Sequence, residues 1–255
     1  MKEILQKIQF SVITLLFFIL LSASILSFAL EKFTREENMK VFIRNFAIEQ
    51  FKDNSDINML YDLHTAQCKA GALEQNVPFE NENKTLSCDE ILQTTKEDYP
   101  VLIIDKFVFS PMYEKNYPCT FFQCLTNKET LPIIFSRQGN FFLSNLKIFL
   151  VIGAIIAALL VAVLSETIPK GLKSIGYTFA VVGGGYYFVD MFPAASFSLA
   201  ESPISPEQIS SQLFGPIKTA SLILLVIGVV LWLTGVGISF YRGEGWLAKI
   251  FGRKK

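Results

Sequence analysis

The chain has 255 residues, of which 51% are hydrophobic and only 18% are charged, and 23 acidic residues balance 23 basic ones. An average soluble domain is about a quarter charged, and here several long stretches carry no charge at all. This composition excludes a purely soluble globular protein, a disordered chain and a basic nucleic-acid binder. With a single histidine, the chain cannot form a histidine-rich metal site, and we expect neither a metal nor another cofactor.

Four apolar stretches approach or exceed the roughly 20 residues that a helix needs to cross a bilayer. They cover residues 8–30, 148–164, 174–199 and 219–240. The sequence therefore predicts a mainly α-helical membrane protein with a four-transmembrane-helix bundle. A cleaved signal peptide is the alternative interpretation of the first stretch. Because the apolar core of a signal peptide has only ~7–15 residues, we expect an uncleaved anchor.

Lysine and arginine near the helix ends predict the orientation of the bundle. They gather before the first helix, between the second and third, and after the fourth, whereas the loop between the third and fourth carries only Lys218. The three basic segments fall on one side of the membrane in a four-helix topology. We expect that side to be the cytoplasm, with both termini there, in a multi-pass protein of the plasma membrane.

The predicted organisation has four parts: an N-terminal transmembrane anchor (1–30), an extracytoplasmic domain (31–143), a three-transmembrane-helix region (144–241) and a basic cytoplasmic tail (242–255). Over residues 31–143, 17 acidic residues exceed 12 basic ones, a net charge of −5. Residues 241–255 carry five basic residues and one acidic residue. The overall charge of zero is therefore the sum of opposite charges that we expect on opposite sides of the membrane.

All the cysteines of the chain, Cys68, Cys88, Cys119 and Cys124, fall in the predicted extracytoplasmic domain. An even number of cysteines confined to an external segment predicts two disulfides, and three pairings are possible. We expect the sequence-local pairs, Cys68–Cys88 and Cys119–Cys124. Such bridges matter in a small domain because its core is small, and closing a loop of ~20 residues stabilises the fold by about 3 kcal/mol.

The close pair Cys119 and Cys124 also allows a redox interpretation. Membrane thiol oxidases present close cysteine pairs beside a four-helix bundle that holds a quinone, and the predicted topology is similar. The redox motif has two residues between its cysteines, however, and four intervene here. Structural disulfides are therefore the favoured interpretation of both pairs.

Hydrophobic spacing predicts that the external domain is mostly helical. Helices are expected over residues 31–51, where the first membrane helix continues outward, over 54–69, and from 88 toward 98. The last of these follows the capping-box pattern Ser-x-x-Glu. Residues 101–109 fit a helix or a strand.

A single Asn-x-Ser/Thr sequon, beginning at Asn83, lies in the polar stretch 80–84. This stretch is predicted to be an exposed loop on the outer side of the membrane. Asn83 is therefore a glycosylation candidate. A chance occurrence of so short a motif is the alternative.

Asp190 is an ionisable residue within the predicted third span, and such residues are functional-site hypotheses by default. At 1.5 Å per residue it lies roughly 24 Å from Ser174, near the outer end of the helix, and Pro193 follows it. An interfacial position is therefore favoured over a role in transport.

Small residues recur at helical spacing in the last three predicted spans, and small residues let membrane helices approach closely. We expect them to mark helix packing, either within one chain or between the chains of a homo-oligomer. These residues are Ala154, Ala158, Ala162, Gly176, Ala180, Gly184, Gly228 and Gly235.

Two segments are predicted to contact the lipid surface. Residues 206–214 fit a short external amphipathic helix. The C-terminal tail combines apolar and basic side chains that suit an anionic cytoplasmic leaflet, and a frayed tail that only enforces topology is the alternative. The candidate tail residues are Trp246, Lys249, Arg253, Lys254 and Lys255.

These features favour a non-enzymatic membrane protein of the scaffold or adhesion type. Its disulfide-stabilised external domain would bind a protein partner or an envelope component, and its helices would anchor it in the lipid bilayer or join it into an oligomer. The alternatives are a membrane thiol-disulfide oxidoreductase using Cys119 and Cys124, and a transporter or transporter subunit using Asp190. We expect His64 to be a packed or surface residue, because no second histidine could complete a catalytic set.

Overall fold

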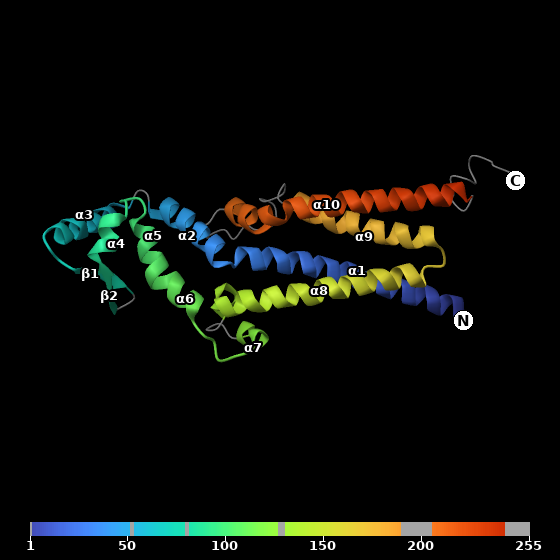
Figure 1. The fold of residues 1–255 in the computed structure, drawn as a ribbon, viewed down its shortest axis with the longest axis horizontal. Coiled ribbons are helices and arrows are strands. Elements are labelled where there is room, and N and C mark those ends of the chain that lie inside the picture. Colours follow the sequence, from blue (N-terminus) through green and yellow to red (C-terminus); the bar gives the residue numbers. More distant parts are fainter. Residues whose placement is uncertain (1, 52–53, 80–81, 127–130, 190–205, 243–255) are drawn as a thin grey trace. The chain divides into compact units, whose positions relative to one another are not determined.

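The computed structural model describes residues 2–51, 54–79, 82–126, 131–189 and 206–242, and it is mainly helical (Figure 1). The chain forms two compact units. We call the one that contains the long helices the bundle unit, and the one formed by the loop between the first two of those helices the inserted unit.

The bundle unit is built on four long helices: α1 (Lys2–Phe33), α8 (Arg137–Leu164), α9 (Ile168–Val189) and α10 (Pro206–Tyr241). Among the described residues, α1, α8 and α10 are long and apolar enough to cross a membrane, so the chain has the character of a membrane protein. Helix α9 is not in that set. It matches the first part of the predicted third span, and the remainder of that span, Asp190 included, lies outside the described residues.

Helix α10 corrects one prediction. Residues 206–214 do not form a separate short helix but the first part of α10, which continues to Tyr241. The helix contains Pro216, between the two predicted segments. Proline removes one helical hydrogen bond, and membrane helices tolerate it in their interior, so the helix runs through that position.

The four helices alternate in direction (Figure 1). Helix α1 runs antiparallel to α8, because the residues near its end contact those near the start of α8. It runs parallel to α9, because three contacts follow the same order along both helices: Thr14 to Ser174, Phe17 to Phe179, and Ser22 to Tyr186. Helix α9 packs antiparallel to α10.

One face of α1 forms the core of the bundle unit. Buried residues recur every four positions, which places them on a single stripe of the helix. This stripe packs against buried residues of α8, while large apolar residues on the opposite side of α8 are exposed, as expected for a lipid-facing surface. The buried residues are Phe17, Leu21, Ile25 and Ala29 of α1, with Ala154, Ala157 and Val161 of α8.

The inserted unit, Phe33–Phe142, consists of short elements. They are α2 (Glu36–Phe51), α3 (Ser55–Lys69), β1 (Glu74–Phe79), β2 (Glu82–Ser87), α4 (Cys88–Gln93), α5 (Tyr99–Ile104), the π-helix η1 (Asp105–Phe109), α6 (Ser110–Glu114), α7 (Phe121–Leu125) and the 3₁₀-helix η2 (Leu131–Phe135).

The helices predicted over residues 31–51 and 54–69 have different outcomes. The second is confirmed as α3. The Asn54 side chain caps this helix by accepting hydrogen bonds from the backbone N–H groups of Asp56 and Ile57. The first is interrupted. Helix α1 ends at Phe33 and α2 begins at Glu36. At the break, the Thr34 side chain is fully buried and accepts a hydrogen bond from Asn140 at 3.0 Å.

The hairpin β1–β2 was not predicted, and it corrects the assignment of residues 80–84 to an exposed loop. Residues 82–84 belong to β2, which pairs antiparallel with β1. Val77 of β1 and Leu86 of β2 are buried, and most of the other strand residues are polar. Such strands give no clear alternating pattern in the sequence.

The predicted capping box is confirmed, and Cys88 begins α4. The helix is shorter than expected and ends at Gln93. Thr94 stops it with an extended backbone, while its hydroxyl donates to the Glu90 carbonyl at 2.7 Å. The stretch 101–109, for which helix and strand both remained open, is helical throughout.

Candidate functional site

Two disulfides lie in the inserted unit, and both have the predicted sequence-local pairing. Cys68 is bonded to Cys88, with 5.3 Å between their Cα atoms, and Cys119 to Cys124, with 5.6 Å. The first bridge joins the end of α3 to the start of α4, so it closes the loop that contains the hairpin. No cysteine of the chain is free.

The core beside the first disulfide contains the single histidine. His64 on α3 is 4% exposed, and its Nδ1 atom lies 2.6 Å from the hydroxyl oxygen of Tyr99, which is fully buried. Burial lowers the pKa of His64 and raises the pKa of Tyr99 to about 12. The Tyr61 ring packs edge to face on Tyr99 at 5.3 Å. His64 is thus a neutral core residue that is shielded from solvent.

The second disulfide is also packed against apolar residues. Cys124 is fully buried beside Tyr117 and Ile133, and Cys119 is half-buried. A redox-active cysteine must be reached by its substrate. The burial of Cys124 therefore favours a structural bond over a catalytic one.

A groove with a volume of about 410 Å³ lies between α2 and α5, within the inserted unit. Its apolar lining includes Val41, Ile43, Val101 and Leu102. Its polar lining consists of two cations, two anions and one hydroxyl: Lys40, Arg44, Asp98, Asp105 and Thr94. A concave surface of apolar residues with a few charged groups is typical of a binding site.

Most of the charges in the groove are engaged within the protein. Arg44 forms an ion pair with Asp98 at 2.9 Å, and Lys40 forms one with Glu36 at 2.9 Å. The pKa of Lys40 is raised chiefly by its hydrogen bond with Glu36, and the negative charge of Asp105 contributes. The groove is therefore nearly neutral, with each cation held beside an anion.

Asp105 differs from its neighbours in the groove. Its Oδ1 atom is buried, and no hydrogen-bond donor reaches it among the described residues. A buried acceptor without a donor costs free energy. Asp105 is also the first residue of the π-helix η1, and π-helical turns are frequent at functional sites. This carboxylate is the most conspicuous candidate for contact with a ligand.

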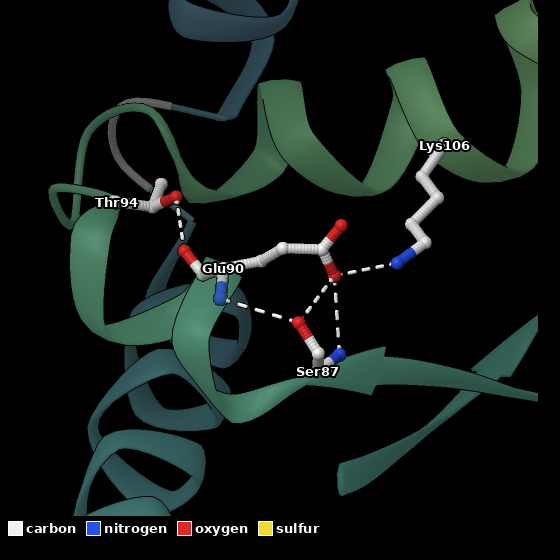
Figure 2. A network of polar contacts seen from close by, with 4 residues as sticks. All are labelled: Ser87, Glu90, Thr94 and Lys106. Atoms are coloured by element: carbon white, nitrogen blue, oxygen red, sulfur yellow. Dashed lines mark hydrogen bonds and ion pairs between the residues drawn. The ribbon is translucent and has the colours of Figure 1, made fainter.

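The neighbouring residue, Lys106, is fixed by a polar network (Figure 2). Lys106 donates to Glu90 Oε2 at 2.5 Å, and the same oxygen accepts from the backbone N–H and the hydroxyl of Ser87. The Lys106 ammonium, more than the contacts with Ser87, lowers the pKa of Glu90. These contacts tie η1 to α4, so the start of η1 is held in place and Asp105 with it.

In the bundle unit, glycines bring α9 and α10 into backbone contact. A Cβ atom on Gly176 would lie 2.5 Å from the backbone nitrogen of Trp232, and one on Gly183 would lie 2.6 Å from the Ser221 carbonyl oxygen. A Cβ on Gly228 would overlap the nitrogen of Ala180. Only glycine fits at these three positions without moving a helix.

The other predicted packing residues differ in how closely they approach a neighbouring helix. Gly184 would make only an ordinary contact, with a Leu225 side chain at 3.5 Å, and its neighbour Gly183 takes the close position. A Cβ on Gly235 would lie 2.9 Å from the Pro169 carbonyl oxygen. On α8 the buried stripe passes through Ala154, Ala157 and Val161, with Ala158 partly buried and Ala162 exposed.

Several predicted site residues are not brought into any site. Asn83 lies in β2, where its backbone is in register with Pro78. Asp190 and all the candidate tail residues, Trp246, Lys249, Arg253, Lys254 and Lys255, lie outside the described residues. Among the residues that the structure does describe, no group of acidic, cysteine or histidine side chains could hold a metal ion.

Sequence reasoning missed the groove and one ion pair. Asp105 gave a weak signal, as an acidic residue within the apolar stretch 101–109. Glu31 and Lys147 gave another, because each directly flanks an apolar run, and in the structure they form an ion pair between α1 and α8. Comparison with models of known protein families, with characterised proteins and with solved structures found no match to this chain.

Proposed function

We propose that this chain is a non-enzymatic, multi-pass protein of the plasma membrane that binds a protein partner outside the cell through the α2–α5 groove. The bundle unit anchors it, through four transmembrane helices. The observation that carries the proposal is a preformed groove that is lined by apolar residues and by Asp105, whose buried Oδ1 atom has no donor among the described residues.

The position of α9 beside α1 supports a fourth span. Thr14, Phe17 and Ser22 lie in the middle of the apolar run of α1, and their partners extend along α9 from Ser174 to Tyr186. A helix that accompanies a membrane-spanning helix over this length occupies the same depth of the bilayer. Exposed apolar residues on α9, such as Tyr177 and Phe188, suit contact with lipid.

The two disulfides support an external location for the inserted unit. Disulfides persist in oxidising compartments and are rare in the cytosol. The basic residues at the opposite helix ends support cytoplasmic termini. In this arrangement Asn83 is accessible to the glycosylation machinery, and an N-linked glycan at that position is part of the proposal.

The chemistry of the groove favours a partner segment with one basic side chain among apolar ones. A lysine or arginine of the partner would pair with the negative charge of Asp105, and the apolar lining would contact the residues beside it. The net charge of −5 over residues 31–143 adds a favourable field for a basic partner.

Site-specific photo-crosslinking in intact cells tests this proposal. A photoreactive residue replaces Val41, which lines the groove and is 52% exposed. A matched probe replaces Val108, which is 40% exposed and is not part of the groove lining. We expect one defined crosslinked protein from the Val41 probe and none of that size from the Val108 probe.

Charge variants then distinguish specific from adventitious crosslinking. Asp105→Asn removes the charge that the partner needs, so it should abolish the Val41 crosslink. Asp62→Asn changes an acidic residue whose ion pair with Lys96 lies outside the groove lining, so it should leave the crosslink unchanged. A crosslink that survives Asp105→Asn, or no crosslink at all, would overturn the proposal.

A further inference from the structure

Four phenylalanines gather where α7 meets the start of α8, in the inserted unit. The rings of Phe121 and Phe142 are stacked, with centroids 4.1 Å apart and an angle of 12° between their planes. Phe122 packs edge to face on Phe142 at 5.4 Å. Phe122 remains 65% exposed, and Phe141 is 70% exposed. Two large aromatic rings thus project from the protein at one place.

The fold holds α7 rigidly in this position. The disulfide Cys119–Cys124 closes the loop around it, and Cys124 is fully buried. At its start, the Thr120 backbone N–H donates to the Gln123 side chain at 3.2 Å. Helix α7, Phe121–Leu125, carries no charged residue.

Helix α8 gives the depth of these rings in a membrane. It is unbroken from Arg137 to Leu164 and is apolar enough to span. Lys147 marks the start of its uncharged run, and Phe142 lies five residues before it, or about 7.5 Å at 1.5 Å per residue. The polar layer on each side of the hydrocarbon core is on the order of 5–8 Å thick. Phe142 therefore lies in the headgroup layer.

From this geometry we infer that α7 is a membrane-surface foot. Phe122 and Phe141 contact the headgroup layer of the leaflet on the side of the inserted unit. The occupant of this aromatic surface is lipid, because Phe142 belongs to a candidate spanning helix and Phe141 begins the exposed stripe that continues through Ile148 and Phe149. Elements with exposed aromatic residues bind membrane interfaces in this way. The inference does not depend on the groove or its partner.

Quenching of tryptophan fluorescence by brominated lipids tests the inference in the full-length protein. The native tryptophans are removed by Trp232→Phe and Trp246→Phe, and Phe122→Trp introduces a single probe. The protein is reconstituted into phosphatidylcholine nanodiscs with bromines either high or low on the acyl chains. We expect more quenching by the shallow bromines than by the deep ones.

Leu73→Trp in the same background is the matched control. Leu73 is 86% exposed and also belongs to the inserted unit, but it lies between α3 and β1 and not beside a spanning helix in the chain. Its fluorescence should be unaffected by bromine at either depth. Quenching of both probes would overturn the inference, because it would mean general adsorption of the unit, and so would an unquenched Phe122→Trp probe.

A second probe guards against a folding defect. The absence of maleimide-reactive thiols verifies that both disulfides remain formed in each variant. Phe141→Trp reports from the other exposed ring, on a different element. Shallow quenching should be seen there too. If correctly bonded Phe141→Trp protein were unquenched while Phe122→Trp had failed to form its bridges, the membrane-surface foot would be rejected.

Discussion

Glu31 on α1 and Lys147 on α8 form an ion pair at the edge of the apolar segments, with 3.3 Å between Oε2 and Nζ. The Glu31 side chain is 3% exposed and that of Lys147 is 22% exposed. The Lys147 ammonium also lies 5.4 Å from the centre of the Phe28 ring, a cation–π distance. Two charges that each flank an apolar run thus neutralise each other between antiparallel helices.

Removal of one partner from this pair should destabilise the bundle unit. Lys147→Met removes the cation beside the buried Glu31 carboxylate, and breaking a buried ion pair in this way costs about 3 kcal/mol. Replacing both charges, with Glu31→Gln and Lys147→Met, should restore most of the lost stability. The unfolding temperature in detergent is compared for the wild type, the single variant and the double variant. Lys170→Ala, which breaks the exposed pair with Glu166, is the control and should change nothing measurable.

The disulfides should contribute unequally to the stability of the inserted unit. Cys68–Cys88 separates its cysteines by 20 residues and Cys119–Cys124 by only 5. Loop-closure entropy gives about 3 kcal/mol for the longer loop and about 2 kcal/mol for the shorter one. The double variants Cys68→Ser/Cys88→Ser and Cys119→Ser/Cys124→Ser of the full chain test the order. Equal unfolding temperatures with and without reductant would contradict a structural role for both bonds.

The sequence predicted the elements that depend on local chemistry. The capping box at Ser87 and the cap at Asn54 involve residues two or three positions apart, and both disulfides joined their nearest partners. The hairpin and the groove depended instead on distant packing. Nothing within the stretch 101–109 indicates that Asp105 would line the same groove as Lys40, because their proximity is set by how α2 packs on α5.

The glycines of α9 also show that contacts between distant residues cannot be predicted from the sequence alone. A helical repeat in α9 predicted close packing but selected Gly184, whereas the backbone contact is made by Gly183. Small residues at both positions fit a helical period, and the sequence alone could not fix which side of α9 faces α10. The choice is made by the partner helix, through Ser221 and Gly228.

Alanine substitutions should distinguish the face of α9 that contacts α10 from the face that does not. Gly176→Ala places a Cβ 2.5 Å from the Trp232 nitrogen, so the helices must move apart and the bundle unit should unfold at a lower temperature. Gly185→Ala is a matched control on the same helix, since its Cβ meets nothing within 4 Å. It should unfold at the wild-type temperature or above, because alanine favours helix. Equal losses in both variants would show that helix α9 does not pack as described.

The buried pair of His64 and Tyr99 should make the inserted unit sensitive to pH at both extremes. The pKa of His64 is lowered by burial, so below about pH 6.5 the unfolded chain binds a proton that the folded chain does not, and stability falls as the pH falls. The pKa of Tyr99 is raised to about 12, so the unfolded chain loses its proton first, and stability falls between about pH 10 and 12.

Unfolding monitored by near-ultraviolet circular dichroism across this pH range measures both effects. A shift of about two pKa units for Tyr99 corresponds to about 3 kcal/mol of stability lost by pH 12. Tyr99→Phe should remove that loss of stability at high pH and keep the loss at low pH. His64→Gln should remove the loss of stability at low pH and keep the loss at high pH. If each variant kept the wild-type profile, the two side chains would not be buried together in the folded protein, since only a difference between folded and unfolded states gives stability a dependence on pH.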